Sequence, residues 1–360
     1  MSSPQKSHFI PACLVVDTDQ TTSRTQAVCT RTMASLTTTI DPDLLQVLDC
    51  LRAASLQIHR DLAAHVGMGV AIQFQDGRPN VVMNASGDKV HAIDELSDLA
   101  VEQHLQSCPS VRGFASEERE SFVSCHPSEE GGKYIVVFDP LDGSQNLPVG
   151  LSVGSIYGIF EASELTDIAS GDDMVAAAYS LYSASLQFVS SVKGQQSLTV
   201  QQYMFPSSEW VVASPNHTRP DVGKIHCINS GNSGNWLLPV QIFVEQHMKP
   251  RSVRWMACMV SDVHRPLMQG GCFLYPSDRK YTKGRLRLVY EAYPMAFLWE
   301  AAGGGVALTG ARQGRILEVP FPHDDVHVRA GVVLLGKKEA EMFEVACGMA
   351  DDRMEDWGAF

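Results

Sequence analysis

Hydrophobic residues recur at helical spacing near the start of the chain. Leucine and isoleucine occupy positions 44, 45, 48, 51, 58 and 62, and Gly67 follows. Asp41 followed by Pro42 is a typical helix start, because the aspartate side chain can cap the helix and proline suits its first turn. We therefore predict a helix over 41–67. A short strand at 81–83, a turn at 84–87 and a second amphipathic helix over about 88–107 are expected next.

The middle of the chain has the pattern of β-strands. Short apolar and β-branched runs at 134–138, 152–160, 174–182 and 186–192 are bounded by Gly, Ser and Asp. Such runs are typical of strands buried in a sheet. We place the acidic stretch GFASEERES (113–121) in a loop before the first of them.

The second half of the chain alternates between the two patterns. Predicted strands lie at 210–214, 272–275, 286–290 and 331–335, and predicted helices lie at 256–269 and 293–302. This alternation predicts an α/β fold. We expect an N-terminal α/β domain over 41–208 and a C-terminal α/β domain over 209–350. No internal repeat or low-complexity linker separates the two domains, so they should share an extensive interface.

The ends of the chain lack such periodicity. We expect a disordered tail over 1–40, rich in Ser and Thr, and a short tail over 351–360. Residues 24–40 contain two arginines and no acid, which faintly resembles an organelle transit peptide, whereas Asp17 and Asp19 just upstream argue against one. A cytoplasmic location is expected, and an organelle remains the alternative.

Composition narrows the class of partner. The 360 residues are 44% hydrophobic and carry a formal charge of −13, as expected for a soluble globular protein. This charge argues against nucleic acid or an anionic membrane as a partner and is compatible with cation binding. No apolar run is long enough to span a membrane. The nine cysteines form no C-x-x-C pair, which favours buried thiols in a reducing compartment.

The segment VVFDPLDGSQN (136–146) carries the most specific chemistry. Asp139 and Asp142 end an apolar strand, and two like charges held this close are unfavourable unless a cation lies between them. Carboxylate oxygens are ligands that Mg²⁺ prefers. The backbone amides of Gly143 and Ser144 could then receive a phosphate. The alternative is a turn with two solvated aspartates.

Other acidic residues could complete such a site. Glu117 and Glu118 lie in the predicted loop, Asp88 and Asp94 lie at the start of the second helix, and Glu291 follows a predicted strand. Each has a structural alternative: a solvated loop face for the glutamate pair, a helix cap for Asp88 and an exposed helix position for Asp94.

These segments together resemble the fructose-1,6-bisphosphatase family, which includes the sedoheptulose-1,7-bisphosphatases. The matching stretches follow in order over roughly residues 40 to 345: GDKVHAID (87–94), SEE (116–118), FDPLDGS (138–144), SVGSIYGIF (152–160), MVSDVHRPLMQGGCFLYP (259–276) and GRLRLVYEAYPMAFLWEAAGG (284–304). The resemblance implies a layered α-β-α-β-α sugar phosphatase fold. It also implies Mg²⁺-dependent hydrolysis of the carbon-1 phosphate of a ketose bisphosphate.

The resemblance further implies a role for each acidic residue. Two or three Mg²⁺ ions, with Mn²⁺ as a substitute, would be bound by the carboxylates of Glu117, Glu118, Asp139, Asp142 and Glu291 and by the Leu141 carbonyl. Asp94 and Glu118 would orient and deprotonate the attacking water, and Asp88 would support them. Carbon-1 phosphate would lie against Asp142, Gly143 and Ser144.

The distal phosphate is expected in a basic and aromatic pocket. By the same resemblance this pocket comprises Asn216, Arg219, Arg254, Trp255, Tyr275 and Arg285, with Arg254 supplied by a neighbouring subunit of a homodimer or homotetramer. Trp255 and Arg285 stand where the family usually has Tyr and Lys. Arg and Lys are not equivalent toward phosphate.

Two sugars remain open as substrates. The stretch 165–194 is closer in length and wording to the sedoheptulose enzymes, whereas SDVHR (261–265) and FLYP (273–276) are closer to the fructose enzymes. The balance slightly favours the seven-carbon sugar, sedoheptulose.

Two regulatory signatures of the family are absent from their usual places in this sequence. They are the AMP-binding run before the first helix and the cysteine pair of the plastid redox switch, so neither AMP inhibition nor thioredoxin activation is expected.

Two further hypotheses stay open. An inositol-monophosphatase-like enzyme would share D-P-L-D-G, but that family pairs it with W-D-x-A-A-G, and this chain has WEAAGG (299–304). A catalytically inactive sugar-phosphate-binding subunit would retain the fold and bind without turnover.

Overall fold

The computed structural model describes residues 40–67, 74–75, 78–79, 82–83, 89–90, 92–126, 131–310 and 314–351. The described residues from 40 to 351 belong to one compact unit. The predicted tails, apart from Ile40 and Asp351, and the predicted turn at 84–87 lie outside the described residues. None of the described helices has the length and apolar composition needed to cross a bilayer.

The two predicted N-terminal helices are confirmed. Helix α2 (Pro42–Gly67) begins after Asp41, whose Oδ1 accepts a hydrogen bond from Asp43 N at 2.9 Å. Helix α3 (Ala92–Gln106) begins later than predicted, since residues 89–90 form β4 (Lys89–Val90), which pairs with β3 (Val82–Met83). The strand expected at 81–83 is thereby confirmed for Val82 and Met83, whereas residue 81 lies outside the described residues. Strands β1 (Phe74–Gln75) and β2 (Arg78–Pro79) form a separate pair.

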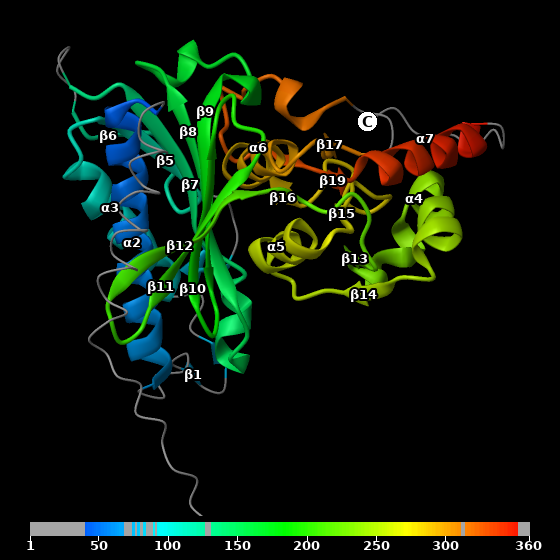
Figure 1. The fold of residues 1–360 in the computed structure, drawn as a ribbon, viewed down its shortest axis with the longest axis horizontal. Helices are drawn as coiled ribbons and strands as arrows, with labels where there is room; N and C mark the ends of the chain where they lie inside the picture. Colours follow the sequence, from blue (N-terminus) through cyan, green and yellow to red (C-terminus); the bar gives the residue numbers. More distant parts are fainter. Residues whose placement is uncertain are drawn as a thin grey trace, which may run out of the picture. The chain divides into compact units, whose positions relative to one another are not determined.

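A mixed sheet of eight strands forms the larger β layer of the described chain, in the order β12-β11-β10-β9-β8-β7-β5-β6. Its strands are β5 (Val111–Ser116), β6 (Val123–Ser124), β7 (Tyr134–Asp142), β8 (Val153–Glu161), β9 (Met174–Tyr182), β10 (Leu186–Val192), β11 (Leu198–Met204) and β12 (Glu209–His217). Helices α2 and α3 pack on one face of this sheet (Figure 1). The runs predicted as strands at 134–138, 152–160, 174–182 and 186–192 all lie in it.

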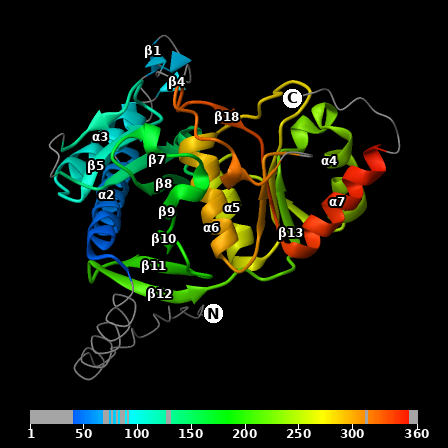
Figure 2. The same ribbon diagram turned by 90° about the horizontal axis from the view of Figure 1, so that it is seen from above.

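A second sheet lies beyond two central helices. Its order among the described residues is β14-β13-β15-β19-β17. The strands are β13 (Ile225–Ile228), β14 (Ser252–Arg254), β15 (Cys272–Tyr275), β17 (Val306–Leu308) and β19 (Val332–Leu335). Helices α5 (Met259–Gln269) and α6 (Tyr293–Ala301) lie between the sheets, and α4 (Leu238–Phe243) and α7 (Lys337–Asp351) cover the outer side of the second (Figure 2). The predicted α-β-α-β-α layering is therefore confirmed.

One continuous core joins the two sheets. It includes Val137 of β7, Ile156 of β8, Val260 of α5, Phe273 of β15 and Leu334 of β19, all at most 1% exposed. A second apolar cluster lies between α2, α3 and the larger sheet, and a third lies under α4 and α7. The interface expected between the halves of the chain is therefore a shared core.

Three local expectations differ from the structure. The strand predicted at 210–214 as part of the second domain is β12, which pairs with β11 at the edge of the larger sheet, so that sheet extends past the expected boundary at 208/209. Residues 113–116 of the expected loop belong to β5, which pairs in parallel with β7. The run 286–290 is a strand only at β16 (Leu286–Arg287) and then becomes the π-helical turn η6 (Leu288–Ala292).

Candidate active site

The two aspartates of the DPLD segment lie at a break in the pairing between β7 and β8. Asp139 is opposite Ile156 and Asp142 is opposite Gly154, so three steps along β7 match two along β8. The intervening backbone is held locally, because Leu141 N donates to Asp139 Oδ1 at 2.9 Å and Ser155 Oγ donates to the Pro140 carbonyl at 2.7 Å. Such a bulge re-aims side chains at a strand end.

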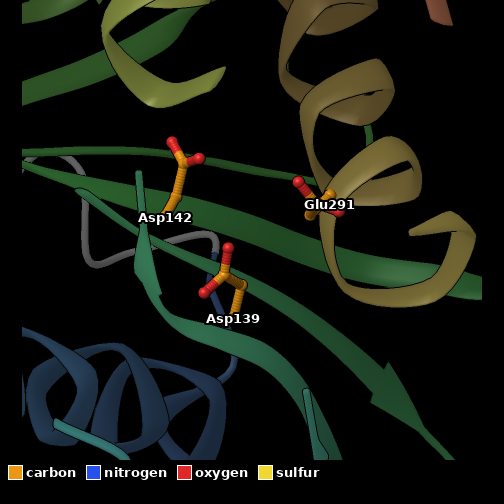
Figure 3. Close-up of side chains that lie close together, drawn as sticks. All are labelled: Asp139, Asp142 and Glu291. Carbon is orange, nitrogen blue, oxygen red and sulfur yellow. The ribbon is translucent and has the colours of Figure 1, made fainter. Parts of the chain in front are cut away.

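Glu291 reaches the same point from the other side. It lies in η6, directly before α6, and its Oε2 accepts a hydrogen bond from Arg287 N. One carboxylate oxygen from each of Asp139, Asp142 and Glu291 lies within 4.8 Å of the others. Figure 3 shows the two aspartates on β7 and Glu291 on the facing helical turn. Segments about 150 residues apart in sequence thus build one acidic cluster.

The cluster is buried and its charges oppose one another. Asp139, Asp142 and Glu291 are 4%, 8% and 7% exposed. Burial raises the pKa of Asp139 and of Glu291 well above the usual range, and the nearby charges of Glu117 and Asp142 raise each of them further. Carboxylates in this state need a compensating cation to ionise together. The donor set of buried hard oxygens therefore fits a divalent metal such as Mg²⁺.

Asp142 is also bound to the N-terminus of α5. Its Oδ1 accepts from Met259 N at 3.0 Å, and its Oδ2 accepts from Val260 N at 2.6 Å and from Cys258 Sγ at 3.1 Å. Burial raises the pKa of Asp142, and these hydrogen bonds oppose that rise. The turn that carries the aspartates is thus attached to the central helix layer.

Gly143 makes this close approach possible. It has φ +76°, and a Cβ placed on it would lie 2.5 Å from Cys258 Cβ. Only glycine satisfies both the left-handed backbone and the short distance at no cost. Gly143 and Ser144 open the 3₁₀ helix η1 (Ser144–Val149), so the predicted phosphate-binding amides lie directly beside Asp142.

The glutamate pair follows β5, next to the DPLD strand. Glu117 N donates to the Phe138 carbonyl at 3.1 Å, and Glu118 N donates to Ser116 Oγ at 3.2 Å. Glu117 Oε1 lies 3.6 Å from Nε of Arg287, whose backbone N donates to Glu291, so Glu117 lies beside the cluster. Its charge contributes to the raised pKa of both Asp139 and Glu291. Glu118 follows Glu117 in the same loop, and the role of Glu118 as a metal ligand stays a prediction.

The two helix-start aspartates have different outcomes. Asp94 lies in the first turn of α3 and is 4% exposed, so the alternative of an exposed helix position is excluded. Asp88 lies outside the described residues. The alternative, in which Asp88 caps the second helix, does not hold for the helix as observed, because β4 separates position 88 from α3. The supporting role of Asp88 stays a prediction.

Arg287 is a candidate site residue that the sequence analysis did not identify. Its Nε lies 3.6 Å from Glu117 Oε1, its backbone N donates to Glu291, and its side chain is only 5% exposed. The signal that could have found it is a lone arginine inside the apolar run LRLVY, since an arginine is rarely buried without a partner.

Three residues of the predicted distal-phosphate pocket, Trp255, Tyr275 and Arg285, lie together in the structure. The rings of Trp255 and Tyr275 pack edge to face at 5.1 Å between centroids. The Arg285 guanidinium lies over the Tyr275 ring at 5.7 Å and over the Tyr281 ring at 4.3 Å. A guanidinium held over two aromatic faces next to an indole can bind a phosphate group through charge-assisted hydrogen bonds.

The other three predicted pocket residues each have a different environment. Asn216 is exposed on β12, where its Oδ1 accepts from Ser197 Oγ at 3.4 Å, and Arg254 is exposed on β14. Arg219 is 7% exposed, donates to the Gly271 carbonyl at 3.2 Å and lies over the Trp299 ring at 5.0 Å. Arg219 is therefore a buried packing partner of Trp299 and does not face the Trp255–Tyr275–Arg285 group in any contact among the described residues.

Comparisons with known proteins agree with this geometry. The family models described as fructose-1-6-bisphosphatase N-terminal and C-terminal domains match residues 25–212 and 219–347. The chain is 39% identical over 264 residues to the cytosolic fructose-1,6-bisphosphatase of Spinacia oleracea, covering 70% of this chain and 75% of that one. The cytosolic enzyme of Arabidopsis thaliana is 37% identical over the same length, with the same coverage.

Solved structures give the same result. The holo form of Leishmania major fructose-1,6-bisphosphatase superposes with a TM-score of 0.78 and 28% identity, over 89% of this chain and 98% of that one. Its apo form gives a TM-score of 0.73 and 27% identity, over 91% and 98% of the two chains. The chain therefore belongs to the fructose-1,6-bisphosphatase family of phosphoric monoester hydrolases, which release phosphate from sugar bisphosphates.

Proposed function

We propose that this enzyme hydrolyses the carbon-1 phosphate of a ketose bisphosphate with Mg²⁺ as cofactor. The observation that carries the proposal is the cluster of three buried carboxylates within 4.8 Å at the end of β7. Asp139, Asp142 and Glu291 would bind two or three ions together with Glu117, Glu118 and the Leu141 carbonyl. Mn²⁺ has the same preference for oxygen ligands and is a natural substitute.

The residues around the cluster would divide the remaining work. The bound ions would supply charge neutralisation and acidify water, which is what phosphoryl transfer chiefly needs. Asp94 and Glu118 would orient the attacking water and accept its proton, with support from Asp88. The amides of Gly143 and Ser144 would hold the phosphate beside Asp142, whose position is set by the first turn of α5.

The opposite end of the sugar would lie against Trp255, Tyr275 and Arg285, with Asn216 and a neighbouring subunit's Arg254 near the distal phosphate. The exposed side chain of Arg254 on the edge strand β14 supports a contribution in trans. We accordingly propose a homodimer or homotetramer, which analytical ultracentrifugation would test.

We also propose a cytosolic location, since relatives carry that word in their names.

Fructose 1,6-bisphosphate is the first candidate substrate, because the similar proteins bear that name. Sedoheptulose 1,7-bisphosphate is the second. The observation that favours it is the Trp255–Tyr275–Arg285 group, in which an indole and a guanidinium occupy the places of the family's Tyr and Lys. A tenfold preference corresponds to a difference of only about 1.4 kcal/mol in transition-state binding between the two sugars. Measurement of kcat/KM for both sugars would decide between them.

The metal-cluster proposal is tested by Asp139→Asn. We expect loss of phosphate release by roughly 10³-fold or more with either sugar at saturating Mg²⁺, because the variant removes a ligand charge without changing side-chain size. Asp49→Asn is the matched control: Asp49 is 62% exposed and forms an ion pair with Arg52 on the surface of α2, so activity should be unchanged. Unaltered activity of Asp139→Asn would refute the proposal.

Inositol monophosphate should be included as a third substrate. Faster phosphate release from it than from either bisphosphate would favour the inositol-monophosphatase alternative. Binding of a bisphosphate without any turnover, at any Mg²⁺ or Mn²⁺ concentration, would favour the inactive sugar-phosphate-binding subunit.

A further inference from the structure

His327 connects the two halves of the proposed metal cluster without belonging to it. It lies between the short helix η7 (Ile316–Glu318) and β18 (Arg329–Ala330), far in sequence from every predicted ligand. The segment is fixed at both ends, since His327 N donates to Asp325 Oδ1 at 2.8 Å and Leu288 N donates to the Val328 carbonyl at 2.8 Å. The backbone of this segment is therefore attached to the first residue of η6.

The imidazole makes a hydrogen bond at each nitrogen. Nε2 lies 3.1 Å from the Arg119 carbonyl oxygen, and Nδ1 lies 2.8 Å from Tyr290 Oη. A carbonyl oxygen can only accept, so Nε2 carries the proton, and in the neutral ring Nδ1 accepts from the tyrosine hydroxyl. Burial, and then the charge of Arg287, lower the pKa of His327, which agrees with a neutral ring.

The partners of His327 are the neighbours of the predicted ligands. Arg119 immediately follows Glu118, and Tyr290 immediately precedes Glu291. The His327 carbonyl accepts from Arg287 Nη1 at 2.9 Å, and the same guanidinium faces Glu117 at 3.6 Å. One residue thus touches the loop of Glu117 and Glu118, the turn of Glu291, and the arginine between them.

Other contacts hold the glutamate loop to a different element. Ser116 Oγ donates to Asp98 Oδ1, and Arg119 forms ion pairs with Asp98 and Glu102 at 2.6 Å each. All these partners lie on α3, so they set the loop against the N-terminal helices. The His327 bonds act across the cluster, between the loop and η6.

We propose that His327 is a positioning residue that holds the glutamate loop and the Glu291 turn at the spacing required to share divalent cations. The proposal rests on the metal cluster proposed above. Mutually repelling carboxylates will not keep a short spacing unless the scaffold imposes it, and outer-shell hydrogen bonds of this kind are known to tune metal affinity.

The test is direct binding of Mn²⁺ to the metal-free full chain, followed by the electron paramagnetic resonance signal of free Mn²⁺. We expect His327→Ala to weaken binding by about 10- to 100-fold, the range typical of lost outer-shell bonds. His327→Gln can still donate to the Arg119 carbonyl and should lie close to wild type. His327→Asn keeps the position of Nδ1 but cannot reach Arg119, so it should resemble the alanine variant.

His323→Ala is the matched control, since His323 is exposed in the same segment. It should bind Mn²⁺ like wild type. In assays of phosphate release, His327→Ala should raise the Mg²⁺ concentration for half-maximal activity by a similar factor, with the sugar KM at saturating Mg²⁺ changed less than about twofold. A role in stability alone would lower the metal-free Tm without this shift.

The outcomes separate the two proposals. Loss of Mn²⁺ binding in Asp139→Asn would support the metal cluster. If His327→Ala then bound Mn²⁺ like wild type, or if His327→Gln and His327→Asn were equally impaired, the role of His327 would be overturned while the metal cluster stood. Equal Mn²⁺ binding by wild type and Asp139→Asn would overturn the metal cluster and this proposal with it. If the alanine variant does not fold, the comparison of Gln with Asn decides.

Discussion

Asp139 and Glu291 hold pKa values raised by burial and by neighbouring carboxylates, and this has a consequence for stability. A carboxyl whose pKa is raised on folding binds more protons in the folded than in the unfolded state above about pH 4. The metal-free protein therefore loses stability through these groups as pH rises from about 4 toward their folded pKa values. A bound cation reverses the effect, because it favours the ionised form.

We predict that Mg²⁺ raises the Tm more at pH 8 than at pH 5.5, by roughly twofold or more. The measurement is thermal denaturation with Mg²⁺ and with EDTA at both pH values. Asp139→Asn is the comparison that isolates the cluster: the metal-free wild type should lose Tm relative to this variant as pH rises. An equal Mg²⁺ effect at both pH values would contradict the prediction.

The glycine beside Asp142 permits a second prediction with a built-in control. Gly143 and Gly150 flank η1 with nearly equal backbone angles, at φ +76° and +70°. A Cβ on Gly143 would meet Cys258 Cβ at 2.5 Å, whereas a Cβ on Gly150 has nothing within 4 Å. Any difference between the two alanine variants therefore reports the contact with α5.

Gly150→Ala should cost about 1–2 kcal/mol of unfolding free energy, through the left-handed backbone alone. Gly143→Ala should cost about 1–3 kcal/mol more from the clash, and should lower kcat because Asp142 loses its place against α5. Urea denaturation and steady-state kinetics measure both effects. Equal stability and equal kcat of the two variants would show that Gly143 is not needed for close packing.

At the scale of elements, the packing of α5 on β9 contains a hydrogen-bonded pair of polar rings, of which Tyr179 is buried and His264 is half-buried. Tyr179 Oη lies 2.7 Å from His264 Nδ1, and burial lowers the pKa of His264 to about 4. The unfolded chain takes up this proton near pH 6.5, so the folded state is stabilised above pH 6.5 and that stability is lost as pH falls toward 4.

We predict that this histidine accounts for roughly 2–3 kcal/mol of acid destabilisation between pH 6.5 and 4. His264→Gln keeps a polar partner for Tyr179 but does not titrate, so its unfolding free energy should vary less over this range. His323→Gln, at an exposed position, should follow wild type. The prediction fails if His264→Gln and wild type show the same pH dependence.

Elements with a strong local pattern were the predictable ones. The bounds of β9 and β10 were predicted to the residue, because each is a mainly apolar and β-branched run with turn residues at its ends. The bounds of α2 were predicted closely, because its apolar residues recur at helical spacing between an aspartate cap and a glycine. The run 286–290 was predicted as a strand, yet most of it is the π-helical turn, since an apolar run alone does not distinguish a strand from a buried helix. The helices α4 and α7 and the strand β13 were not predicted.

The site was predictable where a residue carries its own signal. Asp139, Asp142 and Glu291 follow apolar runs, and the family resemblance assigns all three to one metal cluster. Arg287 and His327 were missed because their importance depends on partners far away in sequence. The burial of Arg219 on Trp299 likewise depends on tertiary packing, which a local motif does not contain.

At the scale of the whole molecule, the two sheets share one core. Helices α5 and α6 pack on β8 and β9 of the larger sheet, and both also contact strands of the second sheet. A Cβ on Gly154 of β8 would lie 2.4 Å from Val260 of α5, which shows how close this packing is. The described part of the chain from 40 to 351 should therefore unfold as one cooperative unit.

A fragment ending after β12, at residue 217, tests this expectation. It would expose the face of the larger sheet that α5 and α6 cover, so it should be aggregated or lack a cooperative transition. The full chain should show one calorimetric transition whose van't Hoff and calorimetric enthalpies agree. Cooperative folding of the isolated fragment would show instead that the larger sheet is an independent domain.

The π-helical turn at Leu288–Ala292 has a consequence for how this protein can change in evolution. A π turn holds one residue more than an α turn, and Glu291 lies inside it. Deletion of a single neighbouring residue would restore the regular pitch and rotate the positions beyond it by about 100°. The carboxylate would then leave the cluster although no ligand had been substituted. Lineages of this enzyme should accordingly accept apolar replacements at Leu288, Val289 and Ala292 but no change in the length of this segment.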